Sequence, residues 1–235
     1  MSTCVQNVPL VRHEFQPFNL RRRKMSHQTV QAISISTALV AAGGIATLSL
    51  FNVPMLKSQL ASRSLPMTRW LFSRGSHIFP QAAVISSAGF TYLAYESLQP
   101  GGNSLADVIS SAIAGGKMSC YAAAAAVLTI SIAPFTTLVM IPTNFALIQK
   151  NEERGGARSE NSAKARGDAP PKRTAEESVD GKNDITQIHD LSGPQEKTLL
   201  DTDAEEDEMV VKLLDKFGKL NMTRVVLMGV ESMND

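Results

Sequence analysis

Cysteine, histidine and the common catalytic motifs are scarce in this chain of 235 residues. Its two cysteines, Cys4 and Cys120, lie far apart, and its four histidines form no HxxxH pair. This scarcity argues against a disulfide framework and against a metal site. The chain also contains no Walker-type, dinucleotide-binding, nucleophile-elbow or HExxH motif. The sequence therefore predicts no metal and no bound organic cofactor.

An excess of charge of one sign is also missing, since the formal net charge is only +1. The one tight basic cluster, residues 21–24, directly precedes an apolar region. Such a cluster is more typical of the solvated flank of a membrane segment than of a nucleic-acid site. We therefore expect no nucleic-acid partner.

Charged residues are absent from three long runs: Ala32–Phe51, Gly75–Tyr95 and Met118–Leu147. About 20 apolar residues suffice for a helix to cross the hydrocarbon core of a bilayer. The pattern predicts an all-α, small integral-membrane helical bundle with three spans and a shorter fourth helix near the C-terminus. It also predicts a multi-pass membrane location, with lipid as a neighbour. Neither the orientation nor the organelle follows from the sequence.

The composition divides the chain into four parts. Residues 1–30 form a polar tail, predicted to be disordered, and residues 31–150 hold the first three helices. Residues 151–207 are rich in charged residues, serine, glycine and proline. This composition buries too little apolar area to offset chain entropy, so it predicts a disordered insertion. Residues 208–235 are expected to form the helix that completes the bundle.

Several polar side chains lie at the ends of the predicted spans. Such groups are costly at a membrane boundary unless they face protein or a water-filled pocket. Trp70 and Arg74 could instead be interfacial anchors, and Arg224 a flank that reaches toward water. His77 could be a structural hydrogen-bonding group, and Asn144 a helix cap or the donor or acceptor of an inter-helix hydrogen bond. Their shared position nevertheless favours one pocket, built from Asn52, Trp70, Arg74, His77, Thr143, Asn144, Asn221 and Arg224.

Five segments resemble the fungal anthrone oxygenase family of small four-helix membrane proteins. The most specific are the string ending in IPTN, within 133–147, and the pattern Phe217, Asn221 and Arg224 within 213–225. Residues 43–56, 69–80 and 94–98 carry the rest. The resemblance covers 31–230 without the insertion 151–207. The chain departs from the family in the long insertion and in the short last helix.

The resemblance implies a cofactor-independent monooxygenase of fungal secondary metabolism that needs no external reductant. It would use O2 as co-substrate to convert a polyketide anthrone, of the norsolorinic acid or emodin type, into an anthraquinone. Other enzymes of such a pathway would be further partners. The competing interpretation is a membrane scaffold, or a carrier for hydrophobic metabolites, without catalytic activity.

The catalytic hypothesis assigns three residues to chemistry. His77 would act as the base because histidine titrates nearest neutral pH, and Arg224 and Asn144 would hold the enolate oxygens. Asn221 would assist them, and Trp70 would stack on the rings. The remaining expected substrate contacts are Arg74, Asn52 and Thr143.

Overall fold

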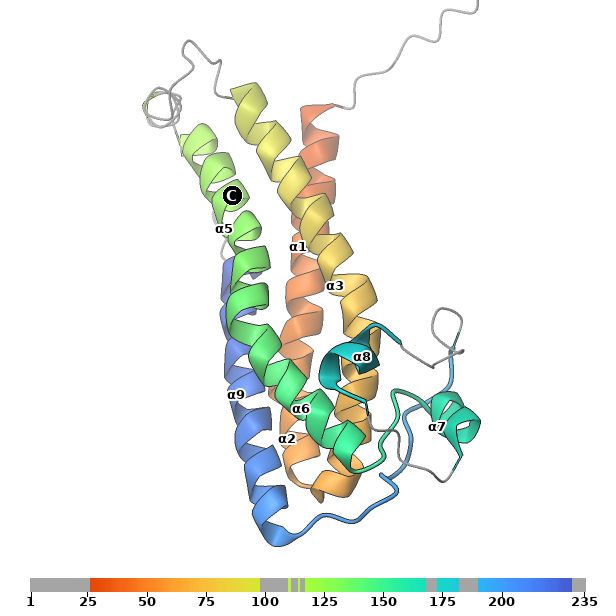
Figure 1. The fold of residues 1–235 in the computed structure, drawn as a ribbon. Helices are drawn as coiled ribbons and strands as arrows, with labels where there is room; N and C mark the ends of the chain where they lie inside the picture. Colours follow the sequence, from red (N-terminus) through yellow and green to blue (C-terminus); the bar gives the residue numbers. More distant parts are fainter. Residues whose placement is uncertain are drawn as a thin grey trace, which may run out of the picture.

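Long helices make up most of the computed structural model, which describes residues 26–97, 110, 114, 117–167, 173–181 and 190–229 (Figure 1). Within these residues the chain is all-helical, as the sequence predicts. The tail expected at 1–30 lies mostly outside them, and the first helix begins at His27. The helical segments are α1 His27–Thr47, η1 Leu48–Asn52, α2 Val53–Lys57, α3 Ala61–Ser97, α5 Lys117–Phe135, η2 Thr136–Met140, α6 Ile141–Glu153, α7 Glu160–Arg166, α8 Ala175–Val179 and α9 Ala204–Gly229.

The long helices pack side by side as a bundle. α1 and α2 form one rod that α3 follows back in the opposite direction, while α5 and α6 pack on α3 and α9 packs on α1 (Figure 1). Asp207, near the start of α9, accepts a 2.7 Å hydrogen bond from the backbone N–H of Ala61 at the start of α3. Lys57 forms a 2.8 Å ion pair with Asp215 of α9. These contacts hold the C-terminal helix against the turn between α2 and α3.

The core differs between the two ends of the bundle. At the end where α2, α6 and α9 meet, large apolar side chains are buried, among them Leu65, Leu147 and Leu214. Toward the other end the core contains three alanines, Ala38, Ala125 and Ala126, packed with Phe90 and Leu93. Small residues let helices approach closely. At Gly89 of α3 an added Cβ would collide with Ser34 of α1, so this crossing requires glycine.

Two short π-helical segments interrupt the long helices, and each ends just before an X-Pro pair. In η1 the Val53 N–H bonds the Leu48 carbonyl, and in η2 the Ile141 N–H bonds the Thr136 carbonyl. Pro54 and Pro142 follow directly. Proline lacks an N–H and crowds the preceding turn, and a widened turn accommodates both effects. The π-turn also rotates the residues before the proline relative to those after it.

The segment 151–207 is folded where the structure describes it, contrary to the expectation of disorder. Of its two short helices, α8 packs on α6 (Figure 1). The fully buried Glu152 accepts hydrogen bonds from Arg173 at 3.0 Å and from Ser178 at 2.6 Å, and Arg166 lies 3.5 Å away. The expectation of disorder considered only the burial of apolar side chains. The described part of this segment is instead held by charge-assisted hydrogen bonds.

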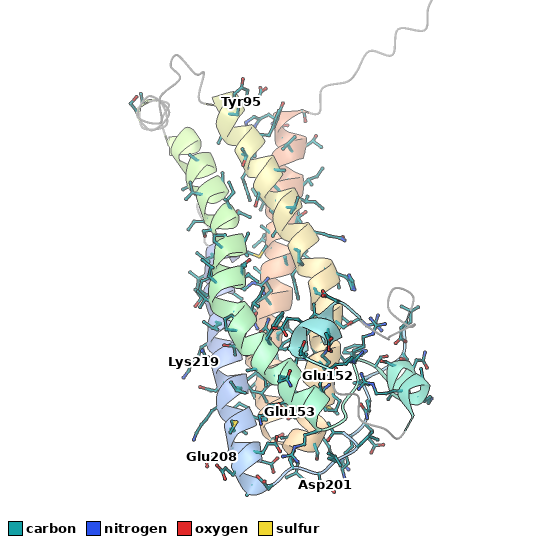
Figure 2. All side chains as sticks on the ribbon, viewed as in Figure 1. Tyr95, Glu152, Glu153, Asp201, Glu208 and Lys219 are labelled. Carbon is teal, nitrogen blue, oxygen red and sulfur yellow. The ribbon has the colours of Figure 1, made fainter. Side chains whose placement is uncertain are left out.

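Two helical stretches, His27–Lys57 and Ala123–Glu153, are long and apolar enough to cross a membrane. The third expected span, Gly75–Tyr95, is not one of them within the described residues. Large apolar side chains face outward on the bundle, including Val40, Val84 and Leu138. Figure 2 shows Glu153, Asp201 and Glu208 at one end of the bundle and Tyr95 at the other. The three-span membrane topology stays a prediction.

We expect Glu152→Ala to lower the free energy of unfolding by about 3–5 kcal/mol, because it leaves buried arginines without their carboxylate. Thermal and denaturant unfolding in detergent micelles would measure the loss. The matched control is Glu160→Ala, since Glu160 makes an exposed ion pair with Lys164 within α7. That change should cost less than about 1 kcal/mol. Equal losses in the two variants would contradict a structural role for the buried network.

Candidate functional site

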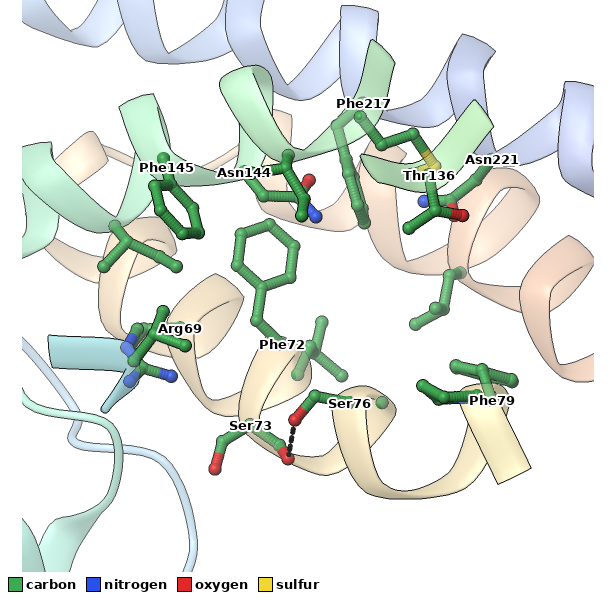
Figure 3. A pocket seen from close by; sticks show the side chains of 18 of the residues that line it. Arg69, Phe72, Ser73, Ser76, Phe79, Thr136, Asn144, Phe145, Phe217 and Asn221 are labelled. Atoms are coloured by element: carbon green, nitrogen blue, oxygen red, sulfur yellow. Dashed lines mark hydrogen bonds between the residues drawn. The ribbon is translucent and has the colours of Figure 1, made fainter. Parts of the chain in front are cut away.

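A cavity of about 330 Å³ lies between α3, the η2–α6 stretch, α9 and the folded part of 151–207 (Figure 3). Ligand pockets in proteins measure roughly 300–1,000 Å³ and combine apolar walls with a few convergent polar groups. Here the apolar wall contains Phe72 of α3 and Phe217 of α9. Their rings meet edge to face with centroids 5.0 Å apart. The cavity is therefore large enough, and apolar enough, for a small hydrophobic ligand.

The face of α3 toward the cavity runs through Arg69, Phe72, Ser76 and Phe79. These positions are three or four residues apart, so they share one side of a helix. Trp70, Arg74 and His77, which the sequence predicts to face one pocket, lie about one position away from this face. Among the three only His77 lines the cavity, as an exposed side chain at its edge.

The π-turn η2 and the IPTN string build the wall opposite α3. Thr136 begins η2 and Asn144 lies in the first turns of α6, and both side chains line the cavity (Figure 3). The alternative role of Asn144 as a helix cap does not hold, because α6 begins after Met140 without a side-chain cap. Thr143, one residue earlier, is buried on another face and does not line the cavity.

The last helix contributes Asn221 and Arg224, which are one turn apart and line the same cavity. The Arg224 Nη1 donates a long hydrogen bond of 3.4 Å to the Asn221 Oδ1. The guanidinium carbon of Arg224 lies 5.9 Å from the ring centroid of Phe79. A cation over an aromatic face is attracted to it, so Phe79 holds Arg224 at this end of the cavity.

Several buried polar atoms in the cavity wall have no hydrogen-bond partner among the residues that the structure describes. They include Thr136 Oγ1, Asn144 Oδ1, Asn221 Nδ2 and Arg224 Nε. Leaving such a group unsatisfied costs about 1–3 kcal/mol, so a group of them in one cavity is unusual for a purely structural core. Together they offer donors and acceptors to an oxygen-bearing ligand.

The folded part of 151–207 closes the cavity at the Arg69 end. Arg158 and Val179 of this segment are lining residues. The Arg69 Nη2 donates to the Ser178 carbonyl at 2.8 Å, and its Nε lies 3.3 Å from the Ser178 Oγ. Because Ser178 also bonds Glu152, the buried network fixes this wall of the cavity.

Trp70 and Arg74 support this segment from outside the cavity. The Trp70 Nε1 and the Arg74 Nη2 donate to the Ser192 carbonyl at 2.9 and 3.2 Å, and Arg74 lies over the Trp70 ring. Next to Ser192, burial would raise the pKa of Asp190, but hydrogen bonds from Ser159, Ser192 and Asn161 lower it to about 2. Asp190 is therefore an ionised acceptor that orders the segment.

The cavity thus brings together four of the residues predicted from the sequence and leaves four outside. His77, Asn144, Asn221 and Arg224 line it, whereas Trp70, Arg74, Asn52 and Thr143 do not. Asn52 is half-buried in η1. Three further lining residues, Arg69, Thr136 and Arg158, were not predicted from the sequence. Helical spacing could have predicted Arg69 as a lining residue, because it lies three residues before Phe72 and therefore on the same side of α3.

Histidine, cysteine and carboxylate side chains form no cluster able to hold a metal ion within the residues that the structure describes. The lining residues offer amides, hydroxyls, guanidinium groups and one imidazole. This set suits the recognition of ligand oxygens rather than the coordination of a hard or soft cation.

The protein is thus a helical bundle that contains a cavity large enough for a small molecule. Residues 67–176 match the family described as Anthrone oxygenase. The Aspergillus fumigatus protein named anthrone oxygenase tpcL is 30% identical over 129 residues, which cover 54% of this chain and 71% of that protein. No solved structure matches the chain. The chain belongs to the anthrone oxygenase family, which confirms the resemblance, and the match extends into the segment 151–207.

We expect Asn144→Leu to raise the free energy of unfolding by about 1 kcal/mol, because it removes a buried amide oxygen that has no protein partner. Denaturant titration would measure the change. Asn161→Leu is the comparison, since Asn161 donates a 3.2 Å hydrogen bond to Asp190 and its loss should not stabilise the protein. If Asn144→Leu destabilised the fold as a core mutation does, the amide would have a structural role.

Proposed function

We propose that this protein oxidises an anthrone to an anthraquinone with molecular oxygen, at the cavity between α3, α6 and α9. Family membership supports anthrone oxygenation in secondary metabolism. The observation that carries the proposal is the arrangement of the cavity. One imidazole, His77, shares an aromatic-walled space with the unsatisfied polar atoms of Asn144, Asn221 and Arg224.

An anthrone can supply all the electrons that this oxidation requires. Loss of a proton from its methylene carbon, which lies between two rings and is conjugated to the carbonyl, gives an electron-rich anthranolate. One electron passes to O2, and recombination of the two radicals at that carbon gives a peroxide, which takes up a proton. The remaining C–H bond and the O–O bond then break, so one oxygen atom becomes the new carbonyl and the other leaves as water. No external reductant is consumed.

The residues have distinct roles in this scheme. His77 accepts the methylene proton and returns it to the peroxide, since it carries the imidazole among the described lining residues and imidazoles commonly act as general bases. Arg224 and Asn221 donate hydrogen bonds to the oxygen on which negative charge develops. Thr136 and Asn144 bind the ring hydroxyls of the substrate. Phe72 and Phe217 contact the flat rings and keep water away.

The scheme requires neither flavin, haem nor metal, and we propose that catalysis is cofactor-independent. The substrate class is a polyketide anthrone of the emodin or norsolorinic acid type, in a pathway of fungal secondary metabolism. We also propose that the bundle is embedded in a membrane, where a poorly soluble substrate would concentrate. Its outward-facing apolar side chains and the two long apolar helices support this placement.

Membranes that contain the protein should convert an anthrone into its quinone faster than membranes without it, with one O2 consumed per quinone. Absorbance and an oxygen electrode would follow the reaction, with and without a metal chelator. Washing the membranes at high pH should leave the protein in place. Equal rates in the two membranes would favour the competing scaffold or carrier, and a chelator-sensitive rate would contradict cofactor independence.

His77→Ala and His77→Gln should each lower kcat by roughly 10²–10⁴-fold, the usual contribution of a positioned base. Progress curves at several pH values would measure the loss and the accompanying change in the pH profile. His27→Gln is the matched control, because His27 is exposed at the start of α1 and does not line the cavity. Full turnover in both His77 variants would show that another group removes the proton.

A further inference from the structure

We propose that the end of the cavity formed by Arg69 and Arg158 recognises a carboxylate on the distal ring of the substrate, so that this protein prefers an acidic tricyclic compound. The inference rests on the proposed function for the tricyclic part of the ligand. It adds a subsite, at the end of the cavity opposite Arg224, that selects among the members of that substrate class.

The charges in the cavity wall support an acidic ligand. The lining residues include Arg69, Arg158 and Arg224 but no aspartate or glutamate among the residues that the structure describes. The nearby Glu152 does not line the cavity, and it accepts hydrogen bonds from Arg173 and Ser178. Guanidinium groups match the geometry of a carboxylate, and a partly enclosed apolar site strengthens such a contact. A ligand whose distal ring carries no charged or polar group would form no such contact with these guanidinium groups.

Arg158 is held in position through both of its chain neighbours. The Ala157 N–H donates to the Gln195 Oε1 at 2.6 Å, and the Ser159 Oγ bonds the buried carboxylate of Asp190. The next backbone N–H, that of residue 160, donates to the carbonyl of residue 193 at 2.9 Å. Arg158 itself is only 8% exposed. Because the Arg158 side chain is buried and its backbone is fixed, it loses little conformational entropy when a ligand binds. This preorganisation favours a specific subsite.

The two ends of the cavity are far enough apart to hold different groups of one ligand. Along α3, Arg69 and Phe79 are ten positions apart, which corresponds to about 15 Å at 1.5 Å per residue. Phe79 lies against Arg224, whereas Arg69 bonds Ser178 of the closing segment. The reacting ring carbonyl therefore occupies the Arg224 end, and the acidic substituent occupies the end that Arg158 lines.

The test compares two probes of equal size, anthraquinone-2-carboxylate and anthraquinone-2-carboxamide, bound to the full-length protein in neutral detergent micelles. We expect the carboxylate to bind about tenfold more tightly, as one charge-assisted contact provides. Arg158→Met should reduce this ratio toward one, and Arg158→Lys should keep most of it. Arg63→Met is the matched control, because Arg63 is exposed on α3 and does not line the cavity.

The outcomes separate the subsite from the proposed function. A ratio near one in the unmodified protein, or a ratio unchanged by Arg158→Met, would overturn the carboxylate subsite, as would failure of both probes to bind. If Arg158→Met does not fold, the ratio in the unmodified protein and in Arg158→Lys decides. An acid preference in a protein that does not oxidise anthrones would refute the enzyme and leave the acid-binding subsite standing.

Discussion

The shape of the cavity depends on one buried carboxylate, that of Glu152 at the end of α6. It bonds Arg173 and Ser178, and Ser178 in turn bonds Arg69 on α3. These bonds attach a polar segment to a bundle whose own helices leave the Arg69 end of the cavity open. A buried charge of this kind is stable only when its partners are all in place, so the segment and the bundle are energetically linked. The wall that contains Arg158 exists because of that link.

The opposite wall depends on backbone geometry rather than on charge. Pro142 cannot donate a backbone hydrogen bond, and the π-turn η2 that precedes it widens the helix. The turn brings Thr136 and, from the first turns of α6, Asn144 to one cavity, whose lining includes buried atoms without protein partners. Each buried polar atom without a hydrogen-bond partner lowers the free energy of unfolding. A binding site needs such groups, because atoms already paired within the protein have nothing left to offer a ligand.

The anthrone oxidation that we propose makes modest demands on a protein, and the lining residues suit them. In the proposed scheme the substrate would carry the electrons and the flat apolar rings, so the protein would need a base, donors for one oxygen and protection from water. These demands require no large catalytic domain. A small helical bundle with aromatic walls and a few convergent polar groups is sufficient, which fits membership of the anthrone oxygenase family.

The sequence by itself determined the helical class, the family and four of the cavity residues, because charge-free runs and the IPTN and Asn221–Arg224 patterns are local. The tertiary structure decided which face of α3 meets the cavity, and it placed Trp70 and Arg74 outside the cavity. Periodicity defines a face, but packing against α6 and α9 decides which face turns inward. It also decided that the described parts of 151–207 fold, because the bonds of Glu152 to Arg173 and Ser178 join residues whose proximity only the folded bundle creates.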